Sequence, residues 1–327
     1  MRAILLKGFG GVEAMEMGDA QVPECKEEEV ILKVKAFGLN RADILQRKGL
    51  YPAPKGSSDI LGLEASGVVE AVGKNVKGIK KGDRLAALLS GGAYAEYTTC
   101  HYKHTMPIPE NMLYQDAAAI PEVFITAFQA LCSIGKLKKG ETLLIHAAAS
   151  GVGTAAIQIA KNLGAVSIGT ASNKKHQACV SIGLDHCIDY KNQDFVEEVN
   201  KITNNGGVDL LIDFVGGSYF QKNLQCVKLD GRMVMLGFLG GVKTSALNLA
   251  SILRNRIQIT GTTLRSRTDD YKAALIQAFK TEIYPLILDG KISPVIHKVF
   301  DWGQFKVAHQ MMEKNENIGK IILNIES

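Results

Sequence analysis

The sequence predicts an α/β protein of two domains, a mostly β domain followed by a doubly wound, parallel sheet. The chain has 327 residues, more than one small hydrophobic core requires. Its first part is rich in glycine and alternates apolar with polar residues, which is typical of half-buried strands. Its later part alternates aliphatic strands with helices, which favours a parallel sheet. We expect domains at 1–120 and 121–265, and a C-terminal segment at 266–327 that returns to the first domain.

The strands of the first domain follow from their alternation and from the turns between them. Glu29–Ala36 alternates apolar and polar residues, Glu64–Val72 is a second expected strand, and a turn-rich connector follows at 73–83. Residues 84–99 indicate two strands with a glycine break. The opening MRAILLKGFG indicates a first strand, because it lacks the apolar core of a targeting segment. No apolar run reaches membrane-spanning length, so we expect a cytoplasmic protein with no membrane partner.

The second domain and the tail follow from the alternation of strand and helix patterns. The apolar stripe at 152–163 has helical spacing and ends at Gly164, a typical C-terminal cap. Strands are expected at 142–147, 166–171, 187–189, 209–214, 232–237 and 257–262, and helices at 152–163, 174–182, 193–202, 218–227 and 247–254. After Tyr271 we expect a long helical stretch, a strand at 295–300, a helix near 304–314 and a final strand at 319–325.

Charge and cysteine usage exclude some classes of protein. The formal net charge is only +5 and the basic residues are scattered, whereas a dedicated nucleic-acid binder shows a denser basic stripe. A nucleic-acid partner is therefore not expected. None of the six cysteines forms a Cys-x-x-Cys pair, so neither a zinc ribbon nor a redox dithiol is indicated.

A cluster of small residues stands where the expected strand at 142–147 meets the helix at 152–163. Ser150, Gly151, Val152 and Gly153 belong to the run Ala-Ala-Ser-Gly-Val-Gly. Small side chains let a pyrophosphate approach the backbone, and the free N–H groups and dipole of a helix start hold the anion. The run departs from Gly-x-Gly-x-x-Gly, so an ordinary strand–helix turn stays an alternative. Its position between strand and helix favours dinucleotide binding.

The residues after the second strand of this domain bear on which dinucleotide is bound. An NAD enzyme places an acid about 20 residues beyond the glycine turn, where it binds the ribose hydroxyls. This sequence instead has Ser172, Lys174 and Lys175, and no acid. A hydroxyl and two ammonium groups suit a 2′-phosphate, so we expect NADPH, although a solvated basic face is the alternative.

Several motifs are spread along the whole chain, at Leu39–Asp43, Tyr51-Pro52, Gly62–Gly67, Gly140–Ala147, Ala148–Gln158 and Asn317–Leu323. Together they resemble those of the zinc-free quinone oxidoreductases, members of the medium-chain dehydrogenase/reductase superfamily. The resemblance runs from residue 1 to Leu323. It extends to the tumour-suppressor-inducible branch through Ala119–Glu122, through Ser150 before Gly151, and through Leu264–Arg267.

The resemblance implies a GroES-like catalytic domain, a Rossmann cofactor domain, NADPH, and a homodimer or possibly a tetramer. An unpaired edge strand at 257–262 is the expected dimer edge. It implies that Tyr51 and Asn40 line the substrate side, and Thr126, expected at a helix start, could reach the nicotinamide. The alternatives are a loop tyrosine packed under Pro52 and Pro54 at position 51, an ordinary turn residue at position 40, and a helix N-cap or buried hydroxyl at position 126. The other cofactor residues that it implies are Ser150, Gly151, Val152, Gly153, Ser172, Lys175, Tyr190, Gly216, Gly217, Gly237, Phe238, Leu239, Thr262, Thr263, Leu264 and Lys320.

The resemblance also bears on metal and on the reaction. Zinc-dependent relatives use a cysteine and a histidine where this chain has Asn40 and Leu63, so we expect no metal. A quinone is already electron-poor, and its reduction depends mainly on positioning. We therefore expect an NADPH-dependent quinone reductase. An alkenal or enone reductase and a non-catalytic NADPH-binding or RNA-binding protein are the alternatives. His146 is interpreted as a hydrogen-bonded core histidine, with an acid–base role as the alternative.

Overall fold

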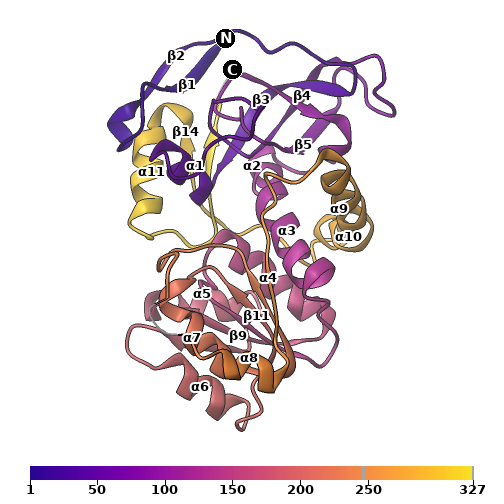
Figure 1. The fold of residues 1–327 in the computed structure, drawn as a ribbon. Helices are drawn as coiled ribbons and strands as arrows, with labels where there is room; N and C mark the ends of the chain where they lie inside the picture. Colours follow the sequence, from indigo (N-terminus) through magenta and orange to yellow (C-terminus); the bar gives the residue numbers. More distant parts are fainter. Residues whose placement is uncertain (245–246, 326–327) are drawn as a thin grey trace. The chain divides into compact units, whose positions relative to one another are not determined.

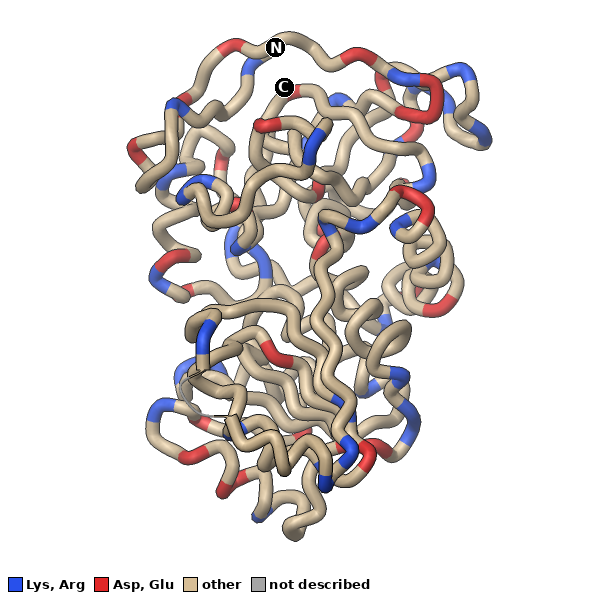
Figure 2. Tube along the Cα trace, viewed as in Figure 1, with Lys and Arg blue, Asp and Glu red and all other residues tan. Residues whose placement is uncertain are grey.

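The described residues, 1–244 and 247–325 of a computed structural model, form two units (Figure 1). The first unit comprises Met1–Ile125, Leu264–Leu288 and Pro294–Ser327, and the second comprises Thr126–Thr263 and Asp289–Ser293. The expected α/β class, with a mostly β part and a parallel sheet, is confirmed. Acidic and basic positions are interspersed along the trace of both units (Figure 2).

The second unit is built on a six-stranded sheet in which every pairing is parallel. The strand order β10-β9-β8-β11-β12-β13 corresponds to 3-2-1-4-5-6, the order of dinucleotide-binding sheets. Aliphatic residues cover both faces of the inner strands, and all of β11 is buried. The strands are β8 (Thr142–Ile145), β9 (Val166–Ala171), β10 (His186–Asp189), β11 (Val208–Asp213), β12 (Val227–Met235) and β13 (Gln258–Gly261).

Helices connect these strands and are bounded largely where the sequence predicts. The helix α4 (Gly151–Leu163) begins after Ser150, whose hydroxyl accepts a hydrogen bond from Gly153 N, and ends at Gly164 with φ 72°. A π-helical segment at Gln129–Ile134 was not predicted. The other helices are η4 (Asn173–Lys175), α5 (His176–Ser181), α6 (Phe195–Ile202), α7 (Gly217–Cys226) and α8 (Leu249–Asn255); α3 (Pro121–Phe128) spans the boundary between the units.

One boundary of this unit was predicted wrongly. The sequence pattern ended a helix at 227 and began a strand at 232, whereas β12 begins directly after α7, at Val227. The backbone of Val227 is already extended, with φ −85° and ψ 127°. Val227 also pairs with Val208 across a bulge in the ladder, so the strand extends through four residues that the sequence pattern left between helix and strand.

The first unit is built on a seven-stranded sheet of order β14-β15-β3-β4-β5-β7, with β6 paired to β3, and on the hairpin β1-β2. The last strand of the chain is antiparallel to β3, with Ile321 opposite Leu39, and the yellow C-terminal elements accordingly lie with the indigo ones (Figure 1). The strands are β1 (Arg2–Leu6), β2 (Met15–Asp19), β3 (Glu29–Leu39), β4 (Glu64–Val72), β5 (Arg84–Leu88), β6 (Tyr97–His101), β7 (Thr105–Pro107), β14 (Ile296–Asp301) and β15 (Lys320–Asn324).

The hydrophobic core of this unit lies between the sheet and its helices. Phe37 and Tyr94 pack ring to ring at 4.5 Å, and Trp302 belongs to the same buried cluster. Because β15 begins beside the end of β3, Lys320 is brought next to Leu39 and the residues after it. The helices of the unit are η1 (Val12–Ala14), α1 (Arg41–Arg47), η2 (Tyr102–His104), α2 (Tyr114–Ala118), α9 (Asp269–Glu282), α10 (Tyr284–Leu288), η5 (Trp302–Gln304) and α11 (Phe305–Glu313).

Candidate functional site

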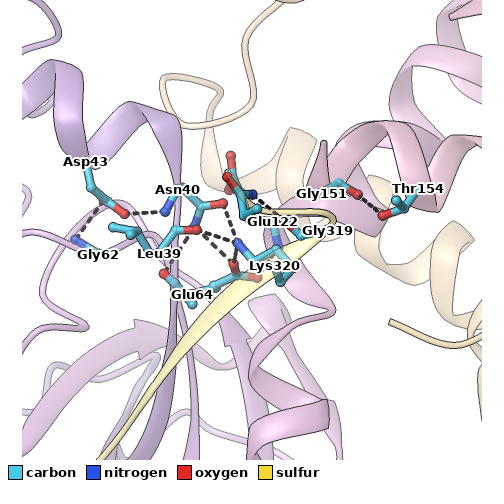
Figure 3. Close-up of polar contacts among 12 residues, drawn as sticks. Leu39, Asn40, Asp43, Gly62, Glu64, Glu122, Gly151, Thr154, Gly319 and Lys320 are labelled. Carbon is cyan, nitrogen blue, oxygen red and sulfur yellow. Dashed lines mark hydrogen bonds and ion pairs between the residues drawn. The ribbon is translucent and has the colours of Figure 1, made fainter. Parts of the chain in front are cut away.

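A buried polar cluster lies in the first unit where β3 ends and β15 begins (Figure 3). The Nζ of Lys320 donates to Leu39 O at 2.9 Å and to Asn40 Oδ1 at 2.7 Å, and it pairs with Glu64 Oε1 at 2.5 Å. Asn40, Glu64 and Lys320 are all buried. The three hydrogens of the ammonium group therefore all have acceptors, and a contact between Lys320 and a cofactor stays a prediction.

Gly38 makes room for the carboxylate in this cluster. A Cβ at position 38 would lie 2.3 Å from Glu64 Oε1 and 3.0 Å from Ala118 O, so only glycine fits. The Nδ2 of Asn40 donates to the same Glu64 oxygen at 3.0 Å. The Glu64 carboxylate is thus held by a cation and an amide from two strand ends. The sequence reasoning gave this residue no catalytic role.

Asp43 extends the cluster at the start of α1. Its carboxylate accepts hydrogen bonds from Asn40 N at 2.8 Å and Gly62 N at 3.1 Å, and Tyr94 OH lies at 3.4 Å. Complete burial raises the pKa of Asp43 to about 6, even though its bond from Asn40 N and the charge of Lys320 oppose that rise. Asp43 therefore holds the turn into α1, and with it the position of Asn40.

Glu122 is a second acidic residue beside this cluster, and sequence reasoning missed it. Its backbone N–H donates to Glu64 Oε2 at 2.8 Å, while its own Oε2 is buried and has no hydrogen-bond partner in the described part of the chain. Burial raises the pKa of Glu122 to about 8; repulsion from Glu64 adds to the rise, and Lys320 opposes it. The carboxyl is therefore largely protonated at neutral pH.

Arg265 and Tyr51 are two further polar residues of the first unit, and both interact electrostatically with Glu122. Arg265 is only 4% exposed, and its Nε donates to Ser90 O at 2.8 Å. Its guanidinium carbon lies 5.5 Å from the centre of the Tyr51 ring. Within residues 1–244 and 247–325, Nη1 and Nη2 of Arg265 have no hydrogen-bond partner. Burial raises the pKa of the Tyr51 hydroxyl, and the charge of Glu122 adds to that rise.

The glycine turn of the second unit has the features of an anion-binding site. The amides of Gly151 and Val152, at the start of α4, make no hydrogen bond to any described residue, so both N–H groups are available to an anion. Ala147, before the turn, adopts a left-handed φ of 50°. A Cβ on Gly153 would lie 2.5 Å from both Ala147 O and Ala148 O, so the turn packs against the helix only with glycine there. These residues fit the pyrophosphate of a dinucleotide.

Most of the expected cofactor residues of the second unit lie at the carboxyl edge of its sheet. Ala171 and Asp189 are paired at the ends of β9 and β10, which places the segments that begin at Ser172 and Tyr190 at one edge. The ends of β11, β12 and β13 lie along the same edge. The segments that begin there contain Gly216, Gly217, Gly237, Phe238, Leu239, Thr262 and Thr263, whereas Asn40, Tyr51, Leu264 and Lys320 belong to the first unit.

Two single-residue interpretations are tested by the structure. Thr126 was expected at a helix start, but α3 begins at Pro121 and Thr126 is its sixth residue; its buried Oγ1 has no partner among the described residues. His146 is a buried, hydrogen-bonded core residue, as interpreted. Its Nδ1 lies 3.1 Å from Thr170 Oγ1 and its Nε2 lies 2.8 Å from Asn223 Oδ1. Desolvation lowers the pKa of His146.

Comparisons with known proteins agree with this architecture. Residues 26–110 match the alcohol dehydrogenase GroES-like domain, and residues 151–281 match the zinc-binding dehydrogenase family. The synaptic vesicle membrane protein VAT-1 homolog of Danio rerio is 35% identical over 99% of this chain and 70% of its own length. This chain belongs to the medium-chain dehydrogenase/reductase superfamily. It is an oxidoreductase with an α/β fold, and its second unit corresponds to the domain that binds a nicotinamide cofactor in this superfamily.

Two solved structures of this superfamily are similar over whole chains. The quinone oxidoreductase of Escherichia coli, complexed with NADPH, has a TM-score of 0.90 at 29% identity, over 99% of this chain and 100% of that one. The CurK enoyl reductase has a TM-score of 0.88 at 28% identity, over 99% of both chains. Among the described helices of this medium-chain reductase, none is both long and apolar enough to cross a bilayer.

The name of one matched family includes zinc, but the residues of this chain do not fit that metal at the first unit's cluster. Asn40 and Leu63 offer no thiolate or imidazole, which are preferred zinc ligands. The Glu64 carboxylate already accepts from Lys320, Asn40 and the Glu122 amide. In the ranges that the structure describes, no group of three His, Cys, Asp or Glu side chains could hold a metal ion.

Proposed function

We propose that this medium-chain reductase transfers hydride from NADPH to a quinone. The observation that carries the proposal is the carboxyl edge of the second unit's sheet. There the free amides of Gly151 and Val152 fit a pyrophosphate, and Ser172 and Lys175 follow a strand with no acid after it. The similar Escherichia coli quinone oxidoreductase was solved with NADPH, which supports the choice of cofactor.

Different residues at the carboxyl edge of the second unit's sheet would hold the successive groups of the cofactor. Gly151 and Val152 would bind the pyrophosphate through their amides, with the dipole of α4 adding to the attraction. Ser172, Lys175 and Tyr190 would bind the adenosine ribose and its 2′-phosphate. When bound, NADPH supplies a hydride. The polar groups of the first unit, Tyr51 and Asn40 among them, would orient the acceptor.

A steady-state assay tests this function directly. NADPH oxidation is followed with several ortho- and para-quinones, each against an uncatalysed control, and NADPH binding is measured by calorimetry. We expect quinone turnover well above the control and tighter binding of NADPH than of NADH. Turnover no faster than the control with every quinone, by protein that binds NADPH, would refute the proposal. The resemblance to the tumour-suppressor-inducible branch would then fail to predict the activity of this chain as well.

Reduction of an activated alkene is the second candidate, because the similar CurK protein is an enoyl reductase. An alkene conjugated to a carbonyl, like a quinone, accepts hydride at carbon and needs a proton afterwards. A trans-2-alkenal reduced with a much higher kcat/KM than any quinone would favour this candidate. The same assay with NADPH decides between the two acceptor classes.

We also propose that the protein is a homodimer through β13, which lies at the edge of the six-stranded sheet. Apolar side chains are exposed on the segment that leads into this strand, among them Leu249 at 65% and Leu253 at 80%. A symmetric partner would cover both the open edge and these side chains. Sedimentation or light scattering of the purified protein measures this directly.

A further inference from the structure

Five side chains of the first unit have buried polar atoms with hydrogen-bonding capacity that no described residue uses. Gln46, Arg47 and Arg84 have one such atom each, whereas Glu122 has its carboxyl Oε2 and Arg265 has both terminal nitrogens. Buried polar atoms in native proteins nearly always have partners, and the exceptions mark functional or ligand-binding positions. Arg265 is nine-tenths buried and still has four unused N–H bonds. Such a fork needs an oxygen acceptor.

Glu122 and Arg265 do not satisfy one another. Each influences the titration of the other, so their charges interact, yet Glu122 Oε2 and the terminal nitrogens of Arg265 have no hydrogen-bond partner in the described part of the chain. Each is fixed by a different neighbour: the Glu122 amide by the Glu64 carboxylate, and the Arg265 Nε by Ser90 O. Tyr51 interacts electrostatically with both. The acid, the guanidinium and the phenol thus interact with one another electrostatically, while Oε2 of the acid and both terminal nitrogens of the guanidinium keep hydrogen-bonding capacity for an oxygen from outside the chain.

We propose that Glu122 donates the proton that completes reduction of the acceptor, while the Arg265 guanidinium holds the acceptor's carbonyl oxygen. This inference rests on the proposed hydride transfer. The hydride adds to a carbon of the acceptor and leaves its conjugated carbonyl oxygen as an anion; NADPH is oxidised and the acceptor is reduced. The O–H bond of the Glu122 carboxyl breaks, and a new O–H bond forms on that oxygen, which gives an enol. The enol then tautomerises, to the hydroquinone from a quinone or to the saturated carbonyl compound from an alkenal, with no further gain or loss of atoms or electrons. Solvent then returns a proton to Glu122, so one proton is consumed per hydride.

The surrounding charges suit a neutral carboxyl at this position. Glu64 on β4 and Asp43 on α1 repel a second carboxylate, whereas Lys320 on β15 and Arg265 attract one. Burial has the largest effect, and the resulting pKa of about 8 keeps the proton on Glu122 at neutral pH. A general acid of this pKa works in its protonated form, so activity should be constant below the pKa and fall as the pH rises through it.

The test compares wild type with Glu122→Gln, which keeps the shape of the side chain and removes its proton. We expect kcat with a quinone to fall about 10²- to 10⁴-fold, the usual contribution of a general acid. The decline of wild-type kcat above about pH 8 should disappear in the variant, and so should the solvent isotope effect on kcat. The dissociation constant for NADPH should stay within about twofold of the wild-type value, since the substitution leaves the carboxyl edge of the second unit's sheet unchanged. Glu122→Asp should recover part of the rate and the alkaline decline.

Two controls separate chemistry from structure. Asp116→Asn removes another carboxyl whose pKa is raised by burial, on α2, and should change neither kcat nor its pH profile. The infrared band of a protonated carboxyl should be present in wild type at neutral pH and absent in Glu122→Gln. Arg265→Lys should lower kcat/KM by about 10-fold or more, because an ammonium lacks the planar fork, whereas Arg267→Lys should not.

The outcomes distinguish this inference from the proposed function. If wild type reduces quinones and Glu122→Gln matches it in rate and pH profile, the inference is overturned and the function stands. If the infrared band of wild type is unchanged by Glu122→Gln, the proton is not on Glu122 and the inference is again overturned. If wild type reduces neither quinones nor alkenals, both the function and the inference are overturned.

Discussion

Replacement of Lys320 by Met should strongly destabilise the first unit. The change removes a buried ammonium group that contacts Leu39 O, Asn40 Oδ1 and the Glu64 carboxylate. Removal of one member of a buried ion pair costs about 3–5 kcal/mol, because it leaves an uncompensated charge in a low-dielectric interior. Here Asn40 Nδ2 and the Glu122 amide continue to bind the carboxylate, which holds the expected loss within that range.

The single tryptophan of the chain makes the measurement specific to this unit. Trp302 is buried in the core of the first unit, so its fluorescence during urea denaturation reports the unfolding of that unit. The free energy of unfolding is obtained for wild type, Lys320→Met, Glu64→Gln and the double variant, as a double-mutant cycle. The double variant should be more stable than Lys320→Met alone, since it removes the buried charge that was left without its cation.

The matched control is Lys81→Met, which breaks an exposed pair with Glu70 in the same unit. We expect almost no change from it, because exposed pairs are screened by solvent. A loss of less than about 1 kcal/mol in Lys320→Met, the range of exposed pairs, would refute the reasoning. A double variant as unstable as the sum of the two single variants would refute it as well.

Four further predictions concern the cofactor edge, pH and assembly. Lys175→Ala should raise the KM for NADPH by about 10-fold and leave that for NADH nearly unchanged, because one charged hydrogen bond to a 2′-phosphate is lost; equal changes would remove Lys175 from phosphate binding. Gly153→Ala should weaken NADPH binding in calorimetry, since its Cβ would lie 2.5 Å from two carbonyl oxygens; Gly8→Ala, with open space around it, should not. Folding raises the pKa of Glu122 from 4.5 to about 8, so its contribution to stability is complete at acid pH and is lost as the pH rises across that interval. The urea midpoint should accordingly fall toward alkaline pH, and less so in Glu122→Gln. Leu253→Glu should shift the protein toward monomer in sedimentation, and an unchanged mass would argue against the β13 interface.

The sequence predicted the fold well because the signals of the second unit are local. The strand Val166–Ala171 has the bounds that the sequence predicts, and Ser150 and Gly164 mark the two ends of α4. No such local signal in the sequence marks the start of β12 at Val227. Its strand register depends on β11, which lies nearly twenty residues earlier in the chain. Local propensity cannot supply a pairing of that kind.

The candidate site was predicted only in part, because its residues come from distant segments. Asn40 and Lys320 were expected on opposite sides of the reaction, as substrate and cofactor residues, yet they are in direct contact through the pairing of β15 with β3. The sequence shows the motifs Ile-Pro-Glu and Leu-Arg-Ser-Arg, but nothing in their spacing shows that Glu122 Oε2 and the terminal nitrogens of Arg265 are buried without partners among the described residues. Burial is a tertiary property, and it is what gives these two residues their chemistry.

The charge balance of the first unit's polar region explains why a proton belongs there. Asp43, Glu64 and Glu122 are three carboxyls that interact with one another, while Lys320 and Arg265 are the cations that act on them. Lys320 is committed to Glu64 by direct contact, and Arg265 keeps its terminal nitrogens for another acceptor. Three ionised carboxylates would leave one buried negative charge uncompensated, which is costly in a low-dielectric interior. A proton on Glu122, the carboxyl whose Oε2 has no partner, removes that excess charge. The same proton is then available to an acceptor oxygen as negative charge develops on it.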